Sequence, residues 1–119
     1  MTNHEGHTGL RTWVEVSKKA LAHNYRMMRK VIGPKTKLMA VAKSNAYGHD
    51  MTQFAREMER LGADWIGVDS IVEGLTLRKA GVALPILVLG YTLGERLEDA
   101  EKYNLSVTVS NFESLVKLS

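Results

Sequence analysis

The stretch that decides how this chain folds is MAVAKSNAYGH, from Met39 to His49. An apolar run typical of a buried strand comes first, and Lys43 ends it, directly before a short polar loop that contains glycine. We therefore expect Lys43 where a strand meets a turn that faces a ligand. A lysine partly withdrawn from water at such a place is a candidate amine nucleophile for a carbonyl. The segment predicts Schiff-base chemistry.

The same succession of apolar runs and amphipathic stretches continues on both sides of this segment. Apolar runs predict strands, and helices are predicted where a capping residue precedes an amphipathic stretch and glycine or proline follows it. The strands are expected at 12–16, 38–42, 65–68, 86–89 and 105–109, and the helices start at Ser17, Asp50, Ser70 (with Glu73), near Arg96 and at Ser110 (with Glu113).

Most of these strands are continuous apolar runs, which is the pattern of parallel strands buried on both faces. Their alternation with helices predicts a parallel α/β architecture. Periodicity does not separate a doubly wound sheet from a barrel. A complete (β/α)₈ barrel needs about 250 residues, whereas this chain has 119 residues, so a barrel interpretation implies about half a barrel.

Composition narrows the classes of protein. The chain is 45% hydrophobic with no apolar run of membrane-spanning length, so we expect one domain-sized unit and no membrane partner. The net charge of +3 is spread over several helices and does not form the basic stripe of a nucleic-acid binder. No cysteine is present, which excludes disulfides and thiolate metal sites.

The N-terminal sequence MTNHEGHTG has no apolar core, so no export signal is predicted and a cytoplasmic location is expected. His4 and His7 lie three positions apart in this polar stretch without companion ligands. We expect an unstructured tail there and no metal site.

The segment from Met39 to His49 resembles the pyridoxal-phosphate attachment motif of alanine racemases, in which an apolar residue, a lysine and an Asn-Ala-Tyr-Gly-His string follow the first barrel strand. Ser44 and Asp50 stand where most family members have alanine and glycine, and neither change touches a reacting group. The matching residues are Val41, Lys43, Asn45, Ala46, Tyr47, Gly48 and His49.

The resemblance implies the N-terminal half of a (β/α)₈ TIM barrel with parallel strands, preceded by a short strand and a helix. It divides the chain into a flexible tail, 1–10, and a partial barrel domain, 11–119, with the family's C-terminal β domain absent. In the family, the opening strand TWVEV pairs with that distant domain. Uncovered strand edges and apolar faces predict that the isolated chain is poorly stable or associates; a cooperative, monomeric unfolding transition would contradict this.

The resemblance also implies the interconversion of L- and D-alanine with pyridoxal 5'-phosphate, supplying D-alanine for peptidoglycan, in a homodimer. Lys43 would attach the cofactor and act as the acid or base on one face of the substrate, and Tyr47 would bind the cofactor phosphate. In the family the second base is a tyrosine from the partner's C-terminal domain, and nothing in this chain aligns with it. We therefore expect the isolated chain to be inactive.

The neighbouring motif residues also have structural interpretations. Tyr47 could pack its ring under the loop and turn its hydroxyl to water. His49 is expected to fix the loop more than to catalyse, Asn45 to bind nearby backbone, and Gly48 to supply backbone freedom for the turn.

Three alternatives remain open. A barrel-type decarboxylase of basic amino acids shares the fold and an A-V-K-x-N string, although the Y-G-H continuation argues against it. A non-catalytic pyridoxal-phosphate carrier with a single barrel domain would suit the short chain, but it leaves the TWVEV strand without a partner. The chain could also have no activity of its own.

Overall fold

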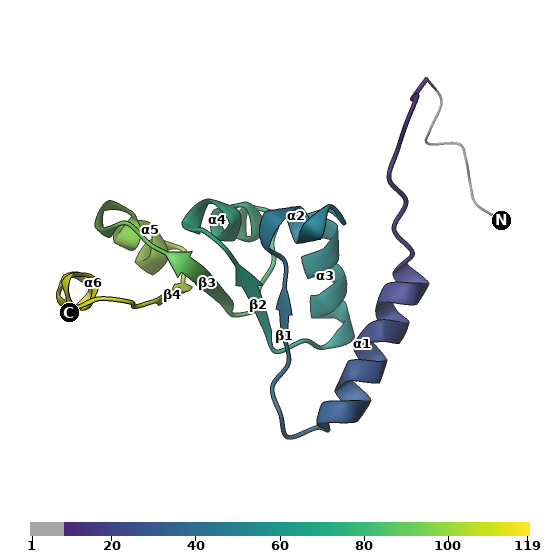
Figure 1. Cartoon of the computed structure of the whole chain (residues 1–119), viewed down its shortest axis with the longest axis horizontal. Coiled ribbons are helices and arrows are strands. Elements are labelled where there is room, and N and C mark those ends of the chain that lie inside the picture. The colour runs from purple at the N-terminus through teal and green to yellow at the C-terminus, as the bar shows by residue number, and fades with distance from the viewer. Residues whose placement is uncertain (1–8) are drawn as a thin grey trace.

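The computed structural model describes residues 9–119. One parallel sheet has the strand order β1-β2-β3-β4, and helices alternate with its strands along the chain (Figure 1). The strands are β1 (Met39–Val41), β2 (Trp65–Val68), β3 (Ile86–Tyr91) and β4 (Leu105–Thr108), and the helices are α1 (Lys18–Ile32), α2 (Lys43–Tyr47), α3 (Met51–Leu61), α4 (Ile71–Lys79), a 3-10 turn η2 (Gly94–Arg96), α5 (Leu97–Lys102) and α6 (Phe112–Leu118).

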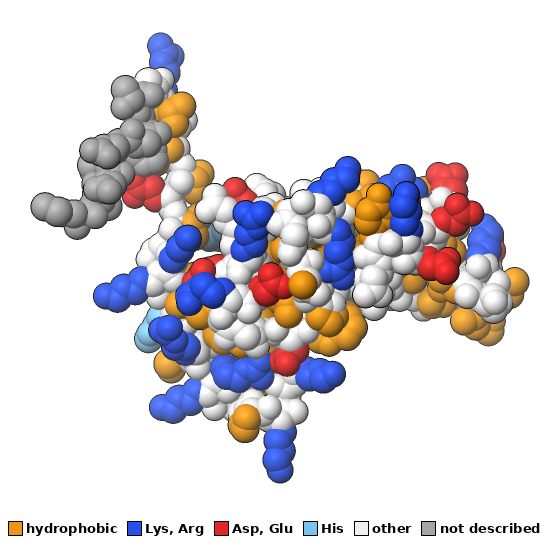
Figure 2. All heavy atoms as spheres, turned by 180° about the vertical axis from the view of Figure 1, so that it is seen from behind, with side chains coloured by type: hydrophobic (Ala, Val, Ile, Leu, Met, Phe, Trp, Pro, Cys, Tyr) orange, Lys and Arg blue, Asp and Glu red, His pale blue; other side chains and the backbone are white. Residues whose placement is uncertain are grey.

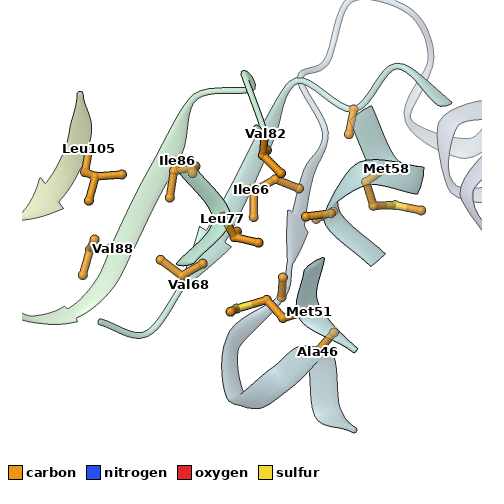
Figure 3. Packing of buried hydrophobic residues seen from close by; sticks show 14 of the residues in the cluster. Ala46, Met51, Met58, Ile66, Val68, Leu77, Val82, Ile86, Val88 and Leu105 are labelled. Atoms are coloured by element: carbon orange, nitrogen blue, oxygen red, sulfur yellow. The ribbon is translucent and has the colours of Figure 1, made fainter. Parts of the chain in front are cut away.

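The predicted parallel α/β architecture is confirmed. Ala40 lies opposite Ile66, Ile66 opposite Ile86, and Ile86 opposite Leu105 in successive parallel ladders. All four side chains are buried, so they form one row on the covered face of the sheet. Figure 3 shows this face, where side chains of β2, β3 and β4 lie around Leu77 of α4.

The other face of the sheet is open within residues 9–119. Met39 and Val41 of β1 are 37% and 36% exposed, and Leu89 of β3 is 38% exposed. The strands are therefore covered on one face only within residues 9–119, not on both as their apolar runs indicate. The open face agrees with the uncovered apolar faces expected of half a barrel. Apolar side chains also gather at the end of the molecule that carries α6 (Figure 2), where Phe112 is 85% exposed.

Residues 12–16 form no strand. They lie as exposed, irregular chain before α1, and the sheet of the described residues does not include them. A strand exists only where a second strand supplies the ladder hydrogen bonds, so the TWVEV pattern is not enough by itself. The expected short strand is thus corrected, whereas the helix after it, α1, is confirmed. Residues 1–8, with His4, His7 and most of the expected tail, lie outside the described residues.

The capping residues set most helix starts as expected. The side chains of Ser17, Asp50 and Ser70 accept hydrogen bonds from backbone N–H groups three residues later. The last helix is an exception. Asn111, not Ser110, caps it, because the Asn111 side-chain oxygen accepts a bond of 2.8 Å from the Ser114 N–H. No helix of residues 9–119 combines the length and the apolar character that crossing a membrane requires.

An ion pair ties α1 to the sheet. Arg29 Nη2 lies 2.8 Å from Asp64 Oδ2, and the same carboxylate oxygen accepts a bond of 2.7 Å from the Leu38 N–H. The Arg29 guanidinium, and next the Leu38 N–H, hold the pKa of Asp64 below its ordinary value. The ionised form of Asp64 therefore favours the folded state.

We expect Asp64→Asn to lower the melting temperature at pH 7, with a deficit that shrinks on acidification. The stabilisation by a lowered folded-state pKa is fully present above the unfolded-state pKa, near 3.8, and is lost as the pH falls through the lower folded value. Thermal melts followed by circular dichroism between pH 7 and pH 3 measure this. Glu113→Gln, which breaks the exposed pair between Glu113 and Lys117, is the control and should change little. A deficit that is the same at every pH would contradict the prediction.

Candidate active site

Lys43 lies at the carboxyl end of β1, as the sequence predicts. The backbone N–H of Ala42 donates to Gly67 O over 2.7 Å, which extends the pairing of β1 with β2 to the residue before the lysine. Lys43 then begins α2, and its side chain is half-buried. In parallel α/β proteins the carboxyl ends of the strands form the edge at which ligands bind.

The turn that follows Lys43 is left-handed. Ser44, Asn45, Ala46 and Tyr47 all have φ between 52° and 55°. For L-residues this conformation costs roughly 1–2 kcal/mol per residue. Four such residues in succession persist only where the surroundings hold them, so the contacts of this turn matter for the site.

Two motif residues hold the turn from within. Asn45 Oδ1 accepts a bond of 2.9 Å from the Met51 N–H at the start of α3. His49 Nδ1 lies 2.9 Å from Ala46 O, and because a carbonyl oxygen only accepts, this ring nitrogen carries the proton. Gly48 ends the turn with φ 90°. The structural roles expected of Asn45, Gly48 and His49 are confirmed.

A third support was not predicted. Glu73 was expected to complete a capping box with Ser70, and its N–H does donate to Ser70 Oγ over 3.3 Å. Its carboxylate, however, binds elsewhere: Oε1 accepts from the Ser44 N–H over 2.8 Å and Oε2 from the Asp69 N–H over 2.7 Å. Figure 1 shows α2 and α4 side by side at this end of the sheet. Glu73 thus links the residue after Lys43 to the end of β2.

The two residues predicted to bind a cofactor, Lys43 and Tyr47, are the first and last residues of α2. Within residues 9–119, neither the Lys43 amine nor the Tyr47 hydroxyl makes a hydrogen bond or an ion pair. Tyr47 is 63% exposed, so its ring does not pack under the loop. A groove of about 400 Å³ lies nearby, between the segment before α1 and α3, but neither Lys43 nor Tyr47 lines it. The candidate site is therefore open along the strand edge.

Charged side chains of both signs lie on the surface of the molecule. Lys and Arg side chains are scattered over the face seen in Figure 2, among acidic and apolar ones. In the part of the chain that the structure describes, no three His, Asp or Glu side chains are grouped so that they could hold a metal ion. Lys43 and Tyr47 offer an amine and a phenol at this edge.

Parallel strands in sequential order, alternating helices and a lysine at the carboxyl end of the first strand define part of a (β/α) barrel with an amine-bearing site. The chain matches the family described as "Alanine racemase, N-terminal domain" over residues 16–119. It belongs to this family, which confirms the resemblance of the Lys43 motif.

Three similar proteins, two compared by sequence and one by structure, are racemases. The chain is 42% identical to the alanine racemase of Synechocystis sp. over 87% of its own length and 28% of the relative's. It is 43% identical to the serine/alanine racemase of Enterococcus gallinarum, over 88% of this chain and 15% of that protein. The alanine racemase of Clostridium difficile 630 in complex with cycloserine superposes with a TM-score of 0.90 at 34% identity, covering 92% of this chain and 30% of that one. The chain thus spans less than a third of the length of these relatives.

Proposed function

We propose that this chain contributes the lysine side of an alanine racemase site that uses pyridoxal 5'-phosphate. The observation that carries the proposal is the Lys43 amine at the carboxyl end of β1, which has no hydrogen-bond or ion-pair partner within residues 9–119. It lies inside the family motif and directly before a left-handed turn. An amine and a phenol within one turn fit two of the functions such a cofactor needs, covalent attachment and a hydrogen bond to its phosphate.

Lys43 has two tasks in this proposal. Its Nζ would hold the cofactor by condensing with the cofactor's aldehyde, with loss of water, and would take or return a proton at the substrate Cα from one face. When bound, the cofactor would withdraw the electron pair left at Cα as the proton departs. Tyr47 would donate its hydroxyl proton to a phosphate oxygen.

Inversion at Cα needs a second acid or base on the opposite face. By analogy with the family, that group comes from the C-terminal domain of a partner subunit in a homodimer, and residues 11–119 act as part of the barrel domain. The whole assembly would supply D-alanine for peptidoglycan in the cytoplasm. The proposed substrate is alanine. Serine is the second candidate, because the chain is similar to a serine/alanine racemase.

The test is reductive trapping on the purified chain. Incubation with pyridoxal phosphate, reduction with borohydride and peptide mass spectrometry locate every modified lysine. We expect modification concentrated at Lys43, and no alanine racemisation by the isolated chain in a D-amino-acid assay. Modification spread over many lysines, or no modification at all, would contradict the proposal for this chain.

Tyr47→Phe tests the phosphate contact. Removing one hydrogen bond to a charged group costs about 1.5–3 kcal/mol, so the pyridoxal phosphate concentration that half-modifies Lys43 should rise about tenfold or more. Because the hydroxyl has no partner within residues 9–119, the fold should be unaffected. Pyridoxal without its phosphate is the matched probe. An equal effect of the substitution on both probes would contradict the assignment.

A further inference from the structure

The carboxylate of Glu73 bridges two backbone segments that meet at the candidate site. One oxygen binds the N–H of Ser44, directly after Lys43, and the other binds the N–H of Asp69, directly after β2. Hydrogen bonds from N–H groups to an ionised carboxylate are stronger than those between neutral groups. The bridge therefore fixes the start of the left-handed turn relative to the second strand.

This use of the glutamate is not a general consequence of its place in a helix. Glu113 also lies in the first turn of its helix, α6, but its carboxylate pairs with Lys117 of the same helix over 2.9 Å. Glu73 instead crosses from α4 to the turn that carries Lys43, 29 positions away in the sequence. The contact thus does not follow from the position of a glutamate in the first turn of a helix alone.

The conformation of Ser44 makes the contact consequential. Ser44 has φ 53°, a conformation that is unfavourable for an L-residue. It persists only where contacts with the surroundings offset its cost. Without the bridge, the peptide that links Lys43 to Ser44 loses its anchor at the end of β2. Lys43 is then held only through β1, and the turn that follows it can shift relative to its side chain.

We propose that Glu73 is a positioning residue for Lys43. Glu73 holds the lysine at a fixed place relative to the carboxyl end of β2 and does not touch cofactor or substrate. The inference rests on the proposed function of Lys43. It assigns to Glu73 the orientation of the amine, while attachment and proton transfer remain with Lys43 itself.

Glu73→Gln is the informative variant, because an amide has one acceptor oxygen and its NH₂ group would face the second N–H donor. In the full chain we expect the yield of trapped Lys43 adduct at limiting pyridoxal phosphate to fall about tenfold. Labelling of Lys43 by formaldehyde should change less than about twofold, because this small probe reacts with an amine in any orientation. Glu113→Gln is the matched control and should leave both yields unchanged. Equal yields with pyridoxal phosphate in wild type and Glu73→Gln would overturn the inference.

Amide hydrogen exchange separates this inference from the proposed function. If the wild-type chain gives no Lys43 adduct, the proposed function fails, and exchange of the Ser44–Tyr47 amides then decides the positioning role. Faster exchange in Glu73→Gln than in Glu113→Gln supports it, and equal exchange overturns it. If Glu73→Gln does not fold, amide exchange in the wild-type chain still tests the bridge: the Ser44 and Asp69 amides must both be protected, and rapid exchange of either one would overturn it.

Discussion

Lys43→Arg is expected to reduce the trapped pyridoxal phosphate at this position to background while the chain keeps its fold. A guanidinium stays protonated at all usable pH values, so arginine retains the charge of lysine but offers no nucleophilic nitrogen. The fold should survive because the Lys43 side chain makes no hydrogen bond or ion pair within residues 9–119. Borohydride trapping with peptide mapping, together with a circular dichroism melt, measures both expectations.

The matched control is Lys79→Arg, which makes the same chemical change at an exposed lysine at the end of α4. This control should leave the Lys43 adduct intact. If Lys43→Arg retains the same total modification, shifted to neighbouring lysines, then the reactivity does not belong to this position. Such a result would remove the basis of the proposed function without affecting the family assignment.

Gly90→Ala is expected to have the largest effect on stability. A Cβ added to Gly90 would lie 2.4 Å from Asp69 O, a backbone atom that cannot swing aside. The same oxygen accepts the Gly90 N–H over 3.0 Å. Overpacking typically costs about 1–3 kcal/mol, and the lost hydrogen bond adds about 1 kcal/mol. For a chain with an open sheet face, this loss should remove most of the folded population at room temperature.

Gly67→Ala is the control for this substitution. Its added Cβ would meet Leu89 Cδ1 and Met39 Sδ, each at 3.1 Å, and both side chains lie on the open face where they can move. A small decrease in the urea midpoint is expected for Gly67→Ala and a loss of the folded baseline for Gly90→Ala. Similar midpoints for the two variants would show that β2 and β3 separate more easily at Asp69 than the contact distance implies.

Much of the fold follows from local signals in the sequence. Glycine and capping residues mark the helix ends, and the apolar runs mark the four strands, so the βα alternation is predictable without a structure. The prediction of a strand at TWVEV was wrong because strand formation depends on a partner strand, which no local pattern reveals. The predicted capping residue of α6 was wrong by one position because Ser110 and Asn111 are both good caps.

The candidate site was predictable in part. The position of Lys43 at a strand end and the structural roles of Asn45, Gly48 and His49 follow from residue type and spacing. The left-handed turn from Ser44 to Tyr47 does not, since serine, alanine and tyrosine carry no preference for it. The Glu73 bridge was also missed, because it joins segments 29 residues apart and the capping-box pattern offered a nearer partner. Cofactor attachment at Lys43 and Tyr47 stays a prediction.

The sequential strand order has a consequence for how the chain acquires its structure. Met39 pairs with Trp65, Ile66 with Ile86, and Ile86 with Leu105, so each ladder joins positions only 19 to 26 residues apart. Each loop that must close is short, and closure entropy grows with loop length. Every βα unit can add to the one before it as soon as it leaves the ribosome, so folding can proceed in the same direction as synthesis.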